Sequence, residues 1–146
     1  MNRIALKRIA LVLALSAVIG AAQAGDGAPD LSKVNGSLVA EAGRTYGNID
    51  TVNGSITVQA KAVARNVETV NGSIVIDSFA SVQDVGTVNG KIVLRNGASA
   101  RGVGTVNGAI VGVSNLRVAK SVEAVNGSIE LGAHSSIGSQ VETVNG

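Results

Sequence analysis

Hydrophobic positions recur along this chain in a pattern that belongs to strands rather than helices. From Val70 to Ile76, apolar or small residues occupy every second position, and Asn71 and Ser73 are the first two residues between them, which is the period-2 signature of a β-strand. Beyond residue 30, no segment carries a sustained apolar stripe at helical spacing. The pattern therefore predicts an all-β chain of short strands separated by corners, with Gly or Asn near the bends.

The tripeptide Val-Asn-Gly opens each unit of a repeat. It occurs at 34–36, 52–54, 70–72, 88–90, 106–108, 125–127 and 144–146, with offsets of 18 or 19 residues. Counted from this Val, apolar residues return at the fifth, seventh and thirteenth positions, and again three or four residues later. One coil cannot bury its own apolar face, but stacked coils can. We therefore predict a single-domain β-solenoid (β-helix) of about six coils over 32–146.

Two of the repeat units are one residue longer than the others. The extra residue falls within Ala119-Lys120-Ser121 in one unit and within Gly138-Ser139-Gln140 in the other. A one-residue slip inside a core strand would turn its inward side chains outward. The insertion therefore predicts a corner or bulge at this place in the coil.

The first 24 residues have the organisation of a secretory signal peptide. Arg3, Lys7 and Arg8 precede an uncharged apolar run from Ile9 to Ile19, and Ala22-Gln23-Ala24 has the form of a signal-peptidase site. The run is shorter than the roughly 20 apolar residues that span a bilayer. We expect a helical signal peptide over 1–24 and a short linker or cap over 25–31. We also expect export to the bacterial periplasm or cell surface, with no stable membrane span after cleavage.

Removal of this segment changes what the composition implies. Three of the 12 Lys and Arg residues lie within it, so nine basic residues remain against ten acidic ones. No basic surplus is left to suggest nucleic-acid binding. The absence of Cys excludes thiolate metal sites and Cys nucleophiles. With Tyr46 and Phe79 as the only aromatic residues and 19 Gly, the composition favours a thin core of small β-branched side chains.

The repeat unit V-N-G-S-I-x-V-x-x-x-A-x-V-x-x-V-E-T resembles an adhesin-type β-strand-repeat family of bacterial exported proteins. More distantly it is similar to the bactofilins, which are filament-forming β-helix proteins. The resemblance covers 34–146, and its motifs are structural, so it implies a fold more than a function. Bactofilins are typically cytoplasmic, and the signal-like N-terminus of this chain departs from them. The departure favours the exported family.

The Asn residues of the repeat are candidates for a side-chain ladder. In register they would stack about 4.8 Å apart, close enough for their amides to hydrogen-bond along the solenoid axis. A structural role at the corner is the main interpretation, and a ligand-binding ladder is the alternative. The residues are Asn35, Asn53, Asn71, Asn89, Asn107, Asn126 and Asn145.

A Thr residue precedes the Val of most repeats, and Lys33 and Ala124 interrupt this column. If Val points inward, Thr and Asn both point outward and form two polar columns on a flat face. Such Thr arrays resemble those of ice-binding solenoids, so an ice- or glycan-binding protein is an alternative function. The candidate binding residues are Thr51, Thr69, Thr87, Thr105 and Thr143.

Candidate catalytic chemistry is sparse. A period of 18 is also three hexapeptides, which raises the alternative of a hexapeptide-repeat acyltransferase, an enzyme class that typically needs a His as general base. The only His is His134, in a corner segment without a long loop, which is typical of a surface residue. Asp50, Glu68, Glu123 and Glu142 share a column that Gly residues interrupt, and we expect a solvated edge there rather than a calcium site.

The sequence thus favours a non-catalytic, exported structural or adhesin-like protein with no cofactor and no metal site. It would act through a rigid repeat face, on a surface or glycan ligand that the sequence does not identify. The seventh Val-Asn-Gly has no coil after it in this sequence. Two explanations stay open: copies of the chain stack head to tail, or the repeat array continues in a longer protein. Spacing alone does not fix the handedness of the solenoid.

Overall fold

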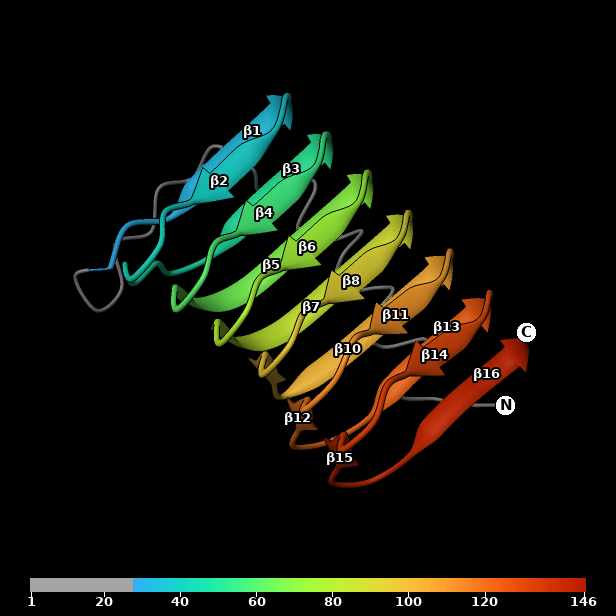
Figure 1. Cartoon of the computed structure of the whole chain (residues 1–146). Helices are drawn as coiled ribbons and strands as arrows, with labels where there is room; N and C mark the ends of the chain where they lie inside the picture. Colours follow the sequence, from blue (N-terminus) through green and yellow to red (C-terminus); the bar gives the residue numbers. More distant parts are fainter. Residues whose placement is uncertain (1–27) are drawn as a thin grey trace.

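The computed structural model describes residues 28–146. This part of the chain is all-β, contains no helix, and forms a parallel β-solenoid of about six turns. Successive coils lie side by side along one axis (Figure 1). The prediction of a β-solenoid is confirmed, whereas the predicted signal peptide lies outside the described residues.

Two parallel sheets make up most of the wall. Sheet A contains, in spatial order, β1 (Leu31–Asn35), β3 (Ile49–Asn53), β5 (Val63–Asn71), β7 (Ser81–Asn89), β10 (Gly102–Asn107), β13 (Val122–Asn126) and β16 (Val141–Asn145). Sheet B contains β2 (Leu38–Ala40), β4 (Ile56–Val58), β6 (Ile74–Ile76), β8 (Ile92–Leu94), β11 (Ile110–Gly112) and β14 (Ile129–Leu131). Each inner strand pairs in register with the strands one coil before and after it, and the strands at the ends of each sheet pair on one side only.

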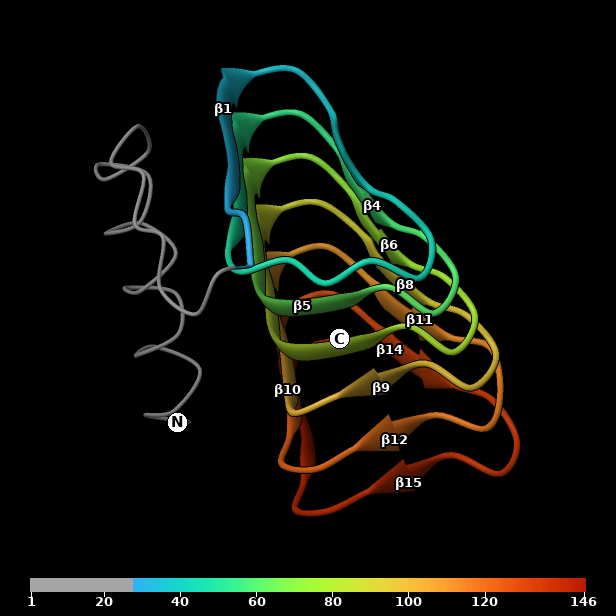
Figure 2. The ribbon, with the colours of Figure 1, turned by 90° about the vertical axis from the view of Figure 1, so that its left-hand side faces the viewer.

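A third side closes the coil between sheet B and sheet A. Its strands are β9 (Ser99–Ala100), β12 (Arg117–Val118) and β15 (Ser136–Ile137). Along this side β12 pairs with both β9 and β15, and Figure 2 shows the three strands stacked below the two main sheets. β5 and β7 are long strands that begin on this third side and continue into sheet A. Each turn of the solenoid therefore has three sides.

The core is a stack of equivalent side chains. Ile56, Ile74, Ile92 and Ile110 form one fully buried column on sheet B. Val67, Val85, Val103 and Val122 form the facing column on sheet A. Because identical positions stack, each layer of the core is a few side chains wide, which explains why the chain folds with almost no aromatic residues.

Two neighbouring coils fill the same part of the core with large and small residues in swapped positions. The seventh repeat position is Leu94 in the fourth coil and Gly112 in the fifth, and a Cβ at Gly112 would overlap a methyl group of Leu116. Leu116 is fully buried, where the coil before it has Ala98. Volume lost at one inward position is therefore regained at another in the same layer, as close packing requires.

The two longer coils differ only at the predicted corner. In these coils strand pairing stops after Val118 and after Ile137, and resumes at Val122 and Val141. The backbone N–H of Lys120 donates to the carbonyl of Arg101, and that of Ser139 donates to the carbonyl of Lys120. The extra residue is thus accommodated outside the core strands, which confirms the prediction from the spacing.

Candidate functional site

The corner between sheets A and B is built by the Asn-Gly step of each repeat. A Cβ placed on Gly72 would overlap the carbonyl oxygen of Gly54 one coil earlier, and the same is true of Gly90 against Gly72. The backbone amide of Gly72 also donates to the carbonyl of Asn89 in the next coil. Glycine is required here because neighbouring backbones approach too closely for any side chain.

The seven repeat Asn residues form a continuous ladder along the outside of this corner. The Nδ2 group of Asn53 donates to Oδ1 of Asn35 at 3.0 Å, and each later Asn donates to the preceding one at 2.9 Å. All seven side chains are exposed. An amide has two donor hydrogens and two acceptor lone pairs, so those inside the ladder keep one of each for solvent or a ligand.

The Thr residues do not accompany the Asn residues on the surface. Thr51, Thr69, Thr87 and Thr105 are at most 3% exposed. Each Oγ1 donates to the carbonyl of the corner Gly one coil earlier, at 3.0–3.3 Å. Thr143 makes the same bond to Gly127 at 2.9 Å but is exposed. The prediction of an outward Thr column is wrong for the four buried residues, which satisfy backbone carbonyls inside the corner.

The Val residues of Val-Asn-Gly point outward instead. Val34 is 55% and Val144 is 53% exposed, and the Val residues between them are partly exposed. Inward alternation along β3 runs through Ile49 and Thr51, whereas along β4 it runs through Ile56 and Val58. The corner at Asn53-Gly54 shifts the phase between these two strands. Extending the sheet B phase backwards through the corner therefore assigns Val52 to the wrong face.

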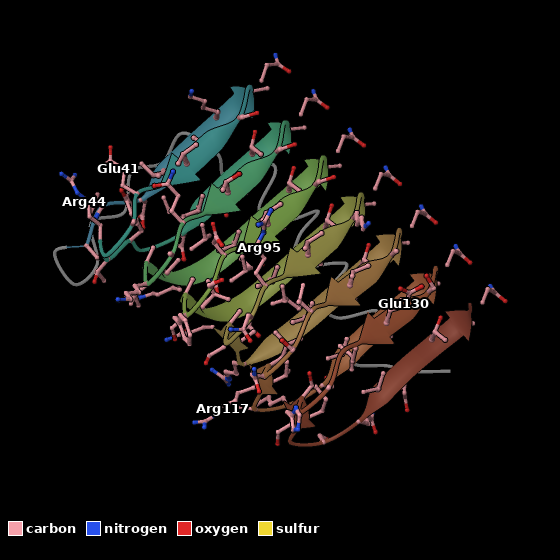
Figure 3. All side chains as sticks on the ribbon, in the orientation of Figure 1. Glu41, Arg44, Arg95, Arg117 and Glu130 are labelled. Atoms are coloured by element: carbon pink, nitrogen blue, oxygen red, sulfur yellow. The ribbon has the colours of Figure 1, made fainter. Side chains whose placement is uncertain are left out.

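Around the corner, the outer surface is largely uncharged. On sheet A it carries the Val column, and at the corner the Asn ladder. On sheet B it carries a second column, Val39, Thr57, Val75, Val93, Val111 and Glu130, whose strand neighbours point inward. This sheet B column lies on the side facing the viewer in Figure 3, where Arg95 and Glu130 are labelled. The Val-Asn-Gly step, which is the most regularly repeated part of the sequence, thus forms part of the outer surface.

Two further sets of side-chain hydrogen bonds between coils lie away from the Asn ladder, and sequence reasoning missed both. Nδ2 of Asn66 donates to Oδ1 of Asn48 at 3.2 Å. Near the opposite corner, Oδ1 of Asn96 accepts from Oγ of Ser114 and Nδ2 of Asn115 at 3.0 and 2.7 Å. The 18-residue spacing could have found the first of these contacts, since Asn48 and Asn66 occupy the same repeat position.

The carboxylates on the outer face of sheet A stack as the register predicts. Asp50 pairs with Glu68, and Glu123 pairs with Glu142. The pKa of Asp50 is raised to about 7 by burial and by Asp30. The pKa of Glu68 is raised to about 7 by burial and by its neighbours Asp50 and Asp84.

The expectation of a solvated edge is wrong for two of these carboxylates, because Glu68 is 4% and Glu123 is 1% exposed. Oγ of Ser121 donates to Glu123 at 2.6 Å, whereas the second carboxylate oxygens of Glu68 and Glu123 have no hydrogen-bond partner. Burial, which raises the pKa of Glu68, could not be read from the alternation of the sequence. Within residues 28–146, no group of three or more His, Asp or Glu side chains is placed to hold a metal ion.

His134 occupies a corner that all coils share. Lys61, Phe79, Asn115 and His134 have φ values of 53–61°, and Gly43 and Gly97 at the equivalent positions have 71° and 75°. His134 is exposed there. The backbone at this corner is left-handed in every coil, although the residue that occupies it varies. His134 is placed by this turn on the solvent side of the wall.

Comparisons of this chain with protein-family models, with curated proteins and with solved structures gave no match. Among the residues that the structure describes, none belongs to a helix long and apolar enough to cross a membrane. The geometry of the repeat is therefore the basis on which function can be argued.

Proposed function

We propose that this protein is a non-catalytic, exported β-solenoid with a structural or adhesin-like role, acting through the rigid outer face formed by its Val-Asn-Gly repeats. The observation that carries the proposal is the exposed Asn ladder, which runs through all seven repeats with Val columns on both sides. Only inward residues pack the core of a solenoid, so outward positions are free to vary. The chain nevertheless repeats the outward Val as regularly as the inward Ile.

Rigidity supports an action through this face. Each inner coil is joined to both neighbours by parallel backbone hydrogen bonds, by the Asn ladder and, in most coils, by a buried Thr bond. Bending the rod would break several of these bonds in adjacent layers at once. A surface held in this way presents its groups at a fixed spacing of about 4.8 Å, which suits repeated weak contacts with an extended partner.

The exposed amides favour glycan binding as a second candidate function. Each inner Asn keeps one donor and one acceptor on the surface, and hydroxyl groups of a sugar chain need both. The ice-binding form of this hypothesis relied on outward Thr residues, and the burial of Thr51, Thr69, Thr87 and Thr105 removes its basis.

End-to-end assembly is opposed at the β1 edge. Lys33 occupies the position at which Thr lies in most other coils, it is exposed, and its Nζ reaches the carbonyl of Ser37 at 3.4 Å. A charged residue at an otherwise inward position disfavours pairing with another strand edge. We therefore favour the outer face over this end of the solenoid as the working surface.

Cell fractionation with analysis of the protein's N-terminus tests export. We expect a processed chain that begins at Gly25 in the periplasmic or surface fraction. An intact chain that begins at Met1 in the cytosol would contradict the proposal.

Co-sedimentation with insoluble cell-envelope glycans tests the face itself. Val88→Lys places a charge in the outer Val column of sheet A, and Gln83→Lys places the same charge on an exposed position at the other end of β7. We expect Val88→Lys to lower the bound fraction and Gln83→Lys to leave it unchanged. Equal binding by the two variants would show that the Val-Asn-Gly face is not the contact surface.

A further inference from the structure

The outer column of sheet B has no role in the fold that requires Val. Val75, Val93 and Val111 are partly exposed and Val39 is 47% exposed, while Ile56, Ile74 and Ile92 fill the core from the other side of the sheet. Thr57 and Glu130 hold the same position in other coils, so the fold accepts polar residues there. A nearly continuous apolar column on the outer side of a parallel sheet is a surface that a second sheet could cover in a dry sheet-to-sheet interface.

Charged side chains border this column in an asymmetric way. Asp77 follows β6 and Arg95 follows β8, one coil apart, and Lys91 precedes β8 on the opposite side of the column. The Arg95 Nε to Asp77 Oδ1 distance is 4.0 Å, with the two side chains 57% and 35% exposed. This long, partly solvated ion pair leaves both groups able to meet an opposite charge on a partner.

We propose that the sheet B face binds a second copy of this chain, with the two solenoid axes antiparallel and the two-fold axis between β6 and β8. Coil spacing is identical in two copies, so the positions of the two columns match along their whole length, with Val opposite Val at the centre. In this arrangement Val75 opposes Val93 of the second copy. Asp77 opposes Arg95 of the second copy, and the reciprocal pair is formed by symmetry.

Charge decides the orientation. With the axes antiparallel, no like charges oppose each other: Lys91 faces Ser73, and Glu130 faces Val39 of the second copy. With the axes parallel, the side of the column that carries Arg95 would oppose the side that carries Lys91, twice by symmetry. Like charges brought together at an interface cost several kcal/mol, so the antiparallel pairing is the favoured one.

Sedimentation equilibrium of the protein purified from exporting cells tests this pairing. We expect a reversible dimer whose dissociation constant rises by more than about tenfold in Val93→Glu, which buries a charge at the centre. The matched variant Gln83→Glu carries the same charge at an exposed position of β7 on sheet A and should dimerise like the unmodified chain. A thermal unfolding curve for each variant separates loss of pairing from loss of fold.

A charge exchange tests the orientation. Asp77→Arg alone would bring a second guanidinium group against that of Arg95 and should weaken the dimer, whereas Asp77→Arg combined with Arg95→Asp should restore it. A monomer at all concentrations would overturn the proposal, as would a dimer or longer assembly that persists in Val93→Glu. Dimerisation that responds to Val93→Glu but not to Asp77→Arg would overturn the antiparallel register. None of these outcomes bears on export or on the sheet A face.

Discussion

At the Asn-Gly corners from Gly54 onward, the carbonyl oxygen of one coil occupies the space where a side chain of the next coil would begin. The sequence alone suggested that this Gly permits a bend. The structure gives a different reason at Gly54, Gly72 and Gly90, where the limit is the distance between adjacent backbones. Gly43, by contrast, has open space around it and a φ of 71°. The two repeat positions thus favour Gly for two different reasons.

Alanine substitutions separate these reasons. Gly72→Ala should lower the free energy of unfolding by about 3 kcal/mol, because rigid backbone one coil away must move. Gly43→Ala should lower it by about 1 kcal/mol, the cost of a left-handed conformation for a residue with a Cβ. Chemical denaturation of both variants checks the order. A smaller loss for Gly72→Ala than for Gly43→Ala would show that neighbouring coils do not pack as closely as described.

The left-handed corner allows a gain in stability. Lys61 is exposed and has a φ of 61°, so Lys61→Gly should raise the free energy of unfolding by about 0.5–1 kcal/mol. Gln83→Gly, at an exposed extended position, should lower it by about the same amount. Thermal or chemical unfolding measures both, and a loss of stability in Lys61→Gly would argue against the left-handed assignment.

Ala124 marks a bond that one coil lacks. Ala124 occupies the Thr position and is 2% exposed, and its register partner Thr105 donates to Gly90. Ala124→Thr should therefore supply a hydrogen bond to the carbonyl of Gly108 and raise the free energy of unfolding by about 1 kcal/mol. Ala124→Val adds the same volume without the hydroxyl. Equal effects of the two variants would show that the hydrogen bond contributes nothing.

At the scale of the elements, the strands of sheet A are joined by the Asn ladder at their ends as well as by their backbone hydrogen bonds. The Asn ladder is directional, because every Nδ2 group donates toward the preceding coil. Inner residues such as Asn89 therefore both donate and accept, whereas Nδ2 of Asn35 donates to no described residue. This difference gives two positions of the same ladder different sensitivity to the loss of a donor.

Replacing Asn by Asp removes the donor and keeps the acceptor. Asn89→Asp should lower the free energy of unfolding by about 1–2 kcal/mol, because two acceptor oxygens then face each other between the third and fourth coils. Asn35→Asp retains the bond from Asn53 and should be nearly neutral. Denaturation at neutral pH compares the two variants, and equal losses would mean that the ladder does not stabilise the stack.

Periodicity predicted most of the elements, because stacking forces equivalent residues into one column. The spacing of Val-Asn-Gly was sufficient to predict the coil length, the Ile and Val columns of the core and the corner at Ala119-Lys120-Ser121. Periodicity could not show which face each column takes across a corner, since the phase of alternation resets at Asn53-Gly54. It also could not show that a buried Thr such as Thr69 would find a backbone acceptor one coil away.

At the scale of the whole molecule, repetition turns local chemistry into a long surface. Residues of one repeat position stay on one side of the rod from coil to coil, so a single exposed amide becomes a ladder and a single exposed Val becomes a column. The proposed two-fold pairing through sheet B and the proposed glycan or surface contact through the Asn edge would use different sides of the corner. Both depend on coils that keep a constant spacing along the axis.

That spacing can be measured directly by electron–electron double resonance between two spin labels. The chain has no Cys, and Ser37, Ser55 and Ser128 are exposed at one repeat position just before sheet B. For Ser55→Cys with Ser128→Cys, four coils apart, we expect a narrow distribution with backbone positions about 19 Å apart. For Ser37→Cys with Ser128→Cys, five coils apart, we expect about 24 Å. Broad distributions, or distances that do not grow by one coil spacing, would contradict a rigid stack with a fixed outer face.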